Sequence, residues 1–144
     1  MPIETRWFVK TGLAWLVLTF AFGAFLLGEK AFGVTAPSLA AVVHAHAGFV
    51  GWLVNLVMGI ALWFLPVNRA RFPKSRGRYP EGAVWTIFGL LNVGLVLRLV
   101  GEPLIDSSAH NIATQTLLVV AGAMQLAAVT LFVSIAWWRV RSVD

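Results

Sequence analysis

The sequence predicts an all-α integral membrane protein, a four-helix bundle with both termini in the cytoplasm. Hydrophobic residues make up 59% of the 144 residues and charged residues 12%, against about 45–50% and about 25% in soluble domains. Four segments are also long and apolar enough to cross the ~30 Å hydrocarbon core of a bilayer as helices. Their length, without period-two alternation, favours helices over the strands of a membrane barrel. The absence of cysteine excludes a disulfide scaffold.

Each predicted span is bounded by residues that break helices or carry charge. As one domain, the chain is expected to span the membrane at residues 7–27, 39–65, 82–100 and 109–138. The connecting segments are rich in Gly, Pro, Ser or charged side chains and comprise residues 28–38, 66–81 and 101–108. Because Glu102 falls in the last of these segments, we expect no acidic side chain inside a span, and nothing indicates a proton pump.

Basic residues set the expected orientation. If the helices alternate, nine of them lie on one side: Arg6, Lys10, Arg69, Arg71, Lys74, Arg76, Arg78, Arg139 and Arg141. The positive-inside rule then places both termini and residues 66–81 in the cytoplasm, in a multi-pass protein of the inner membrane. An aromatic belt is expected at the same end, formed by Trp7, Trp63, Trp137 and Trp138. Orientation and anionic headgroups account for the net charge of +5, so we expect no nucleic acid partner.

Ionisable side chains within the predicted spans gather at the other, outer end. They are His44, His46, Arg98 and His110, and include every histidine of the chain. Ionisable groups at membrane depth are costly and are functional candidates. Neutral imidazole is the commonest nitrogen ligand for metals and haem iron, and helix bundles hold such cofactors in their cores. We therefore expect the three histidines to bind metal or haem, and Arg98 to pair with a haem propionate.

Each assignment has a structural alternative. The histidines could serve only as interhelical hydrogen-bonding groups, His110 could help to cap the fourth helix, and Arg98 could pair with Glu102 four residues later. Gly48, Gly51 and Gly59 leave room for a flat macrocycle or, more commonly for any one glycine, for a neighbouring helix. Interhelical polar contacts are the expected role of the neutral polar residues Asn55, Asn92, Gln115 and Gln125.

The spacing of His44 and His46 points to two separate roles. At about 100° per residue, side chains two apart point to nearly opposite sides of a straight helix. His44 shares its side with Gly48, Gly51 and Asn55, which we expect to face the bundle. His46 shares its side with an apolar stripe that could face lipid or another subunit: Phe49, Val50, Leu53 and Val57. We therefore expect a homo-oligomer that covers His46.

Residues 44–66 read HAHAGFVGWLVNLVMGIALWFLP, which fits the pattern H-x-H-x4-G-[FW]-x6-G-x6-P. This segment resembles the helix with paired histidines in the NnrS family of membrane proteins, which contain haem and copper and are linked to nitric oxide. It is similar, more loosely, to the helix bearing the low-spin haem ligand in catalytic subunits of haem-copper oxidases and nitric oxide reductases. The residues that match the NnrS pattern are His44, His46, Gly51, Trp52, Gly59 and Pro66.

The resemblance implies b-type haem bound through a helix 2 histidine, for electron transfer with a redox partner or for binding a diatomic gas such as NO or O2. Those relatives have many more helices and histidines, and three histidines cannot supply a full oxidase centre within one subunit. Two alternatives remain: a copper-binding or copper-delivery protein using His44, His46 and His110, and a non-catalytic accessory subunit of a respiratory oxidase. The chain has no P-loop or GxGxxG fingerprint, and the sequence leaves open whether the protein is an enzyme.

Overall fold

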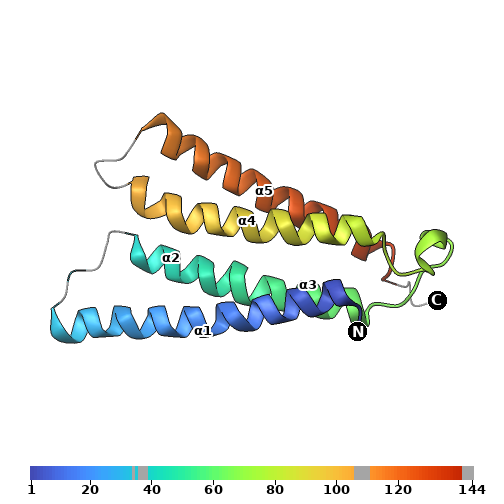
Figure 1. Ribbon diagram of the computed structural model, residues 1–144, viewed down its shortest axis with the longest axis horizontal. Helices are drawn as coiled ribbons and strands as arrows, with labels where there is room; N and C mark the ends of the chain where they lie inside the picture. Colours follow the sequence, from blue (N-terminus) through green and yellow to red (C-terminus); the bar gives the residue numbers. More distant parts are fainter. Residues whose placement is uncertain (34, 36–38, 106–110, 141–144) are drawn as a thin grey trace.

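The computed structural model of the protein describes residues 1–33, 35, 39–105 and 111–140. In this part of the chain the regular structure is entirely helical (Figure 1). The elements are α1 (Ile3–Phe32), α2 (Ala40–His46), the π-helical η1 (Ala47–Val54), α3 (Asn55–Phe64), the 3-10 turn η2 (Pro73–Ser75), α4 (Glu81–Ile105) and α5 (Ile112–Trp137). Since α2, η1 and α3 form one continuous helix, four helices are long and apolar enough to cross a membrane. The predicted all-α multi-pass membrane bundle is confirmed.

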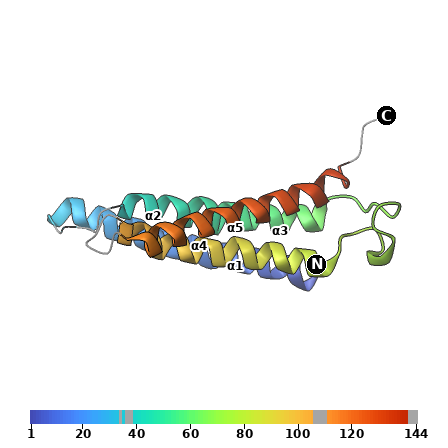
Figure 2. The same ribbon diagram turned by 90° about the horizontal axis from the view of Figure 1, so that it is seen from above.

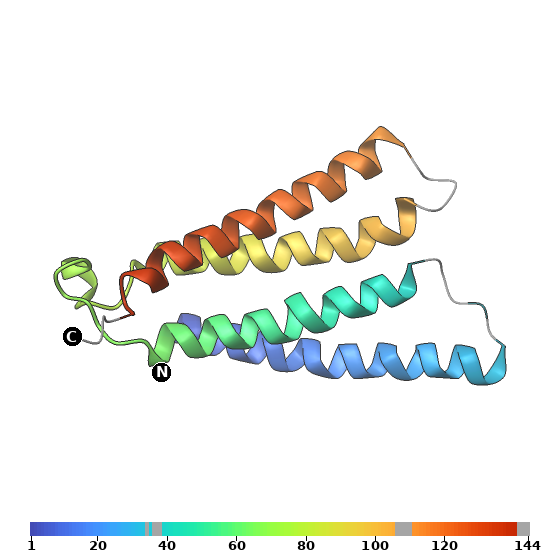
Figure 3. The same ribbon diagram turned by 180° about the vertical axis from the view of Figure 1, so that it is seen from behind.

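The helix at 40–64 and α4 lie at the centre of the molecule. The first helix, α1, packs along residues 40–64, and α5 packs along α4. In Figures 1 and 3, α1 and α5 are the outer helices, and they diverge toward the end opposite the termini. Figure 2 shows that all the helices run along one long axis. The N-terminus, residues 66–80 and the end of α5 share one end, here called the terminal end; His44 and His46 lie toward the other, the histidine end.

The third span differs from its predicted bounds. Residues 101–105 continue α4 instead of starting a loop, so Glu102 lies inside a spanning helix, and the expectation of no acidic residue there was wrong. Pro103 falls in the last turn of α4, where it has no N–H to donate to the carbonyl of Leu99. Close packing supports this turn, because a Cβ atom on Gly101 would lie 2.6 Å from Cδ2 of Leu117 on α5.

Glycines bring α1 close to the helix at 40–64. A Cβ atom on Gly51 would lie 2.7 Å from Cγ of Trp15, and one on Gly59 would lie 2.8 Å from Cβ of Phe8. Both distances are too short for a real carbon atom, so each glycine is required by a side chain of α1. Small residues at such crossings let helices approach closely in lipid. The helix-packing alternative for these glycines is thus confirmed, and they leave no space for a macrocycle.

A buried amide pair joins the two central helices. Asn55 is fully buried, and its amide exchanges hydrogen bonds of 3.1 and 3.0 Å with that of Asn92 on α4. Asn55 Nδ2 also lies 2.9 Å from the carbonyl oxygen of Gly51 and 3.3 Å from that of Val50, both within the π-helical segment. This confirms the predicted interhelical role of both asparagines and ties the wide π-helical turn to α4.

Arg139 closes the terminal end. It is 2% exposed and donates hydrogen bonds to the carbonyl oxygens of Leu62, Leu65 and Pro66, which end α3. Terminal carbonyls lack helical partners, and a basic side chain satisfies them well. Burial lowers the pKa of Arg139 from its ordinary value. The predicted aromatic belt is on the surface here, since four tryptophans are at least half exposed: Trp7, Trp63, Trp137 and Trp138.

Replacing Gly51 by alanine should destabilise the protein by ~1–3 kcal/mol, because the new methyl group overlaps the Trp15 ring. Thermal unfolding in mild detergent, followed by circular dichroism, measures this change. Gly122→Ala is the matched control, since a Cβ atom on Gly122 meets no atom within 4 Å. Equal unfolding temperatures for the two variants would contradict the close approach of α1 to η1.

Candidate functional site

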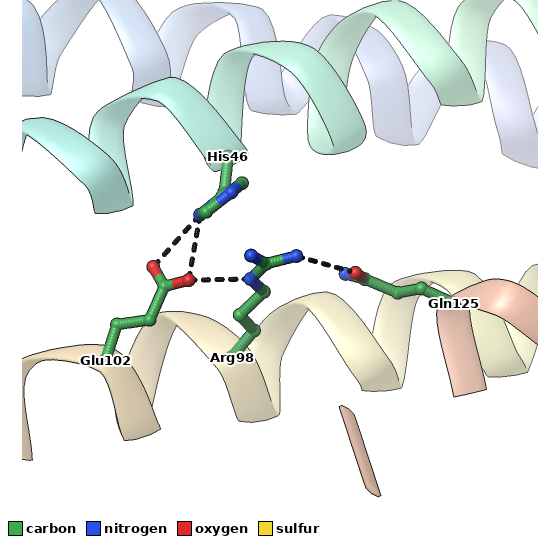
Figure 4. A network of polar contacts seen from close by, with 4 residues as sticks. All are labelled: His46, Arg98, Glu102 and Gln125. Atoms are coloured by element: carbon green, nitrogen blue, oxygen red, sulfur yellow. Dashed lines mark hydrogen bonds and ion pairs between the residues drawn. The ribbon is translucent and has the colours of Figure 1, made fainter. Parts of the chain in front are cut away.

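A polar network at the histidine end joins three helices (Figure 4). His46 Nδ1 lies 2.9 Å from Oε1 of Glu102 and 3.1 Å from its Oε2. Nε of Arg98 donates to Oε1 of Glu102 at 2.6 Å, and Nη1 donates to Oε1 of Gln125 on α5 at 3.3 Å. The Glu102 side chain is only 8% exposed, against 23% for His46 and 33% for Arg98. A buried carboxylate therefore holds an imidazole and a guanidinium between the central helices.

His46 faces α4, which corrects the expectation that it faces lipid or another subunit. Residues four apart share a helix face, and Val50, four residues after His46, packs against the core. The other members of its predicted stripe do point outward: Phe49, Leu53 and Val57 are 62%, 39% and 52% exposed. His46 therefore gives no reason to expect an oligomer.

Arg98 forms the ion pair that was given as its structural alternative, because its guanidinium pairs with Glu102 within α4. Its positive charge offsets that of the carboxylate, and a ring N–H at Nδ1 of His46 can donate to the same carboxylate. Histidines that bind metals commonly donate their other ring N–H to a carboxylate in this way. No described residue hydrogen-bonds to Nε2 of His46. Pairing of Arg98 with a haem propionate stays a prediction.

His44 faces the opposite way, toward α1, as the spacing of the two histidines predicts. A Cβ atom on Gly23 would lie 3.0 Å from Cε1 of His44, and the His44 ring centroid is 6.2 Å from that of Phe22. Nδ1 of His44 is buried and has no hydrogen-bond partner among the residues that the structure describes. Since about 90% or more of buried polar groups are paired, such an orphaned nitrogen calls for an explanation.

The His44 cavity lies between α1 and α2. Its volume is about 510 Å³, within the ~300–1,000 Å³ typical of ligand pockets. The lining residues are Thr19, Phe20, Gly23, Ala24, Leu26, Leu27, Lys30 and His44. The Thr19 hydroxyl is also buried, without a hydrogen-bond partner in the described part of the chain. Because Phe20 and Leu27 are 72% and 69% exposed, the cavity opens on the outer surface of the bundle.

The chemistry of the His44 cavity suits a flat apolar cofactor with a negative group. An imidazole can ligate iron, apolar walls accept a ring system, and Lys30 offers a cation where α1 ends. Within the described residues, no cluster of three or more His, Cys, Asp or Glu side chains could hold a metal ion. A copper site on His44 and His46 together is disfavoured, since the two rings face different helices.

His110 lies outside the described residues, so its predicted role as a ligand is not tested. The cap of α5 is Asn111, whose side chain accepts hydrogen bonds from the backbone N–H groups of Ala113 and Thr114. Asn111 and Thr114 together form a capping box.

Two charged residues of these sites, Glu102 and Lys30, are not among the site residues predicted from the sequence. Glu102 lies between Gly101 and Pro103, and these two residues predicted a loop at this position. Its spacing of four residues from Arg98 did suggest an ion pair. Lys30 was placed outside the first span, but α1 continues to Phe32 and brings Lys30 to the cavity. A side chain that follows a long apolar run by a few residues can still belong to the helix.

Substitution of Arg98 by leucine should lower the free energy of unfolding by about 2 kcal/mol, because it leaves Glu102 buried without its cation. This lies below the ~3–5 kcal/mol of a fully buried pair, since 33% of the Arg98 side chain is exposed. Adding Glu102→Leu removes both charges and should restore most of the loss. Thermal unfolding in detergent measures both variants. A double variant as unstable as the single one would show that the ion pair is not what stabilises this end.

Comparison of the chain with protein-family models, with curated proteins and with solved structures finds no match. No function can therefore be carried over from a relative through these comparisons. The assignment of function depends on the side chains that line the His44 cavity and on the network around Glu102.

Proposed function

We propose that this protein is a membrane-embedded b-type haem protein, with His44 as the axial ligand and the haem in the His44 cavity. The observation that carries the proposal is the orphaned, buried Nδ1 of an imidazole that lines a cavity of cofactor size. The sequence motif at residues 44–66 points to the same residue type on the same helix. The cavity observation is independent of the His46–Glu102 network.

Different residues of the cavity would bind different parts of the haem. An imidazole nitrogen of His44 would donate its lone pair to iron. On the facing side of α1, Gly23 and Ala24 have small side chains that leave space for the ligand. The ammonium of Lys30 suits a propionate. Thr19 offers a buried hydroxyl with no other partner. When bound, haem supplies one-electron chemistry and a coordination position for diatomic gases.

Binding of a diatomic gas is favoured over electron transfer between two histidine ligands. Of the residues that the structure describes, His44 alone supplies an imidazole to the cavity. His46, the other described histidine, is turned to α4 and engaged by Glu102. One protein ligand leaves a coordination position for NO or O2, whereas a pair of histidines would occupy both.

A second copy of the chain fits this proposal for a new reason. The His44 cavity is open beside Phe20 and Leu27, two large apolar side chains at the surface of α1. A haem held there would present one edge to lipid unless another surface covered it. A homo-oligomer that packs α1 against α1 would close the site.

Replacing His44 by alanine should abolish haem retention. The protein is purified from cells supplied with a haem precursor, and haem per chain is measured by the pyridine haemochrome spectrum together with iron and copper analysis. His46→Gln is the matched control, because His46 faces α4, and it should retain haem. External imidazole should restore a Soret band to His44→Gly.

Colourless wild-type protein would overturn the proposal, and copper without porphyrin would favour the copper-binding alternative. Unchanged haem content and an unchanged spectrum in His44→Ala would remove His44 as the ligand. Loss of haem in His46→Gln alone would show that His46, which faces α4, is the ligand.

The reduced haem protein should bind carbon monoxide, since the cavity offers one imidazole. The expected result is a shift of the Soret band on adding the gas, complete at one carbon monoxide per haem. A low-spin spectrum that carbon monoxide does not change would show two strong protein ligands and would favour electron transfer.

A further inference from the structure

A second hollow lies at the terminal end, where the loop between α3 and α4 meets the start of α1. Its volume is about 710 Å³. Four exposed basic side chains line it: Arg71, Lys74, Arg76 and Arg78. Two acidic residues, Glu4 and Glu81, line it as well. Within the described part of the chain, none of the four cations forms an ion pair, so their charge is available to an external anion.

The loop that presents these cations is folded. The backbone N–H of Asn68 donates to the carbonyl of Gly77 at 2.6 Å, and the N–H of Gly77 donates to that of Phe72 at 2.8 Å. The Asn68 side chain accepts from the N–H of Arg71 at 2.9 Å and donates to the carbonyl of Trp138 at 2.5 Å. Gly77 has φ of +86°, which glycine adopts without strain. The backbone that carries the basic side chains is therefore held in place against the end of α5.

A buried hydroxyl also lines the hollow. Tyr79 is 3% exposed, and its hydroxyl lies close enough to the Glu4 carboxylate to interact with it, with no other hydrogen-bond partner among the described residues. Burial, together with the nearby Glu4 carboxylate, raises the pKa of Tyr79, so the phenol stays protonated and can donate. Several cations and a hydroxyl donor around one hollow suit a group with several negatively charged oxygens, such as phosphate.

We propose that this hollow binds the phosphate of an anionic phospholipid headgroup. Exposed tryptophans at the same end place the hollow at the membrane–water interface: Trp7, Trp63 and Trp138 are 50%, 55% and 51% exposed. Arg71 lies 5.0 Å above the Trp138 ring, which holds one cation at this level. The site differs from general attraction of a basic loop to a charged surface, because it binds one lipid per chain at defined side chains.

Native mass spectrometry of the detergent-solubilised full chain tests this site. The protein is titrated separately with phosphatidylglycerol, with phosphatidylcholine of the same acyl chains, and with inorganic phosphate. The site variant is Lys74→Gln with Arg78→Gln. The matched control is Lys10→Gln with Arg69→Gln, which removes two exposed charges from the same end but none from the hollow. Circular dichroism checks that both variants keep their helices.

The expected result is one tightly bound phosphatidylglycerol per chain, with phosphatidylcholine at least tenfold weaker. The site variant should bind phosphatidylglycerol roughly thirtyfold more weakly, and the control within about threefold of the wild type. Equal losses in the two variants, or equal affinity for the two lipids, would overturn the proposal. Displacement of the lipid by inorganic phosphate at matched concentration would also overturn it, by showing that free phosphate is the ligand.

Discussion

Polar pairing across the central helices is the interaction on which the rest of this structure depends. In lipid, apolar surfaces gain little by meeting each other, so close packing and interhelical hydrogen bonds must hold the helices together. Asn55 with Asn92, and His46 with Glu102, form two such contacts between residues 40–64 and α4. The outer helices then add to these two, α1 through glycine contacts and α5 along α4.

The two histidines of α2 serve different neighbours because of this arrangement. Once Glu102 engages His46, the helix is turned so that His44 faces α1. One imidazole is thus hydrogen-bonded within the protein through Nδ1, whereas the other lines a cavity and has no partner for its Nδ1 among the described residues. A cofactor proposal on His44 therefore does not compete with the network that stabilises the bundle.

The two ends of the molecule differ in their roles: one stabilises the fold, and the other holds the candidate site at His44. At the terminal end, Arg139 and Asn68 bind the end of α5 to the loop and to α3, and free basic side chains surround a hollow. At the histidine end, the outer helices diverge, and Arg98 and Glu102 pair with each other. Anchoring at one end leaves the other end for the proposed cofactor site at His44.

Length and hydropathy were enough to predict four helical spans and their alternation, because the bilayer imposes both on each segment separately. The opposite directions of His44 and His46 also followed from the helical repeat alone. The rotation of residues 40–64 against α4, and hence the partner of His46, depends on packing and on the π-helical turn at 47–54. The inclusion of Glu102 in α4 was decided by contact of Gly101 with α5. Such contacts join residues distant in the chain, so only the tertiary structure could decide which polar groups meet.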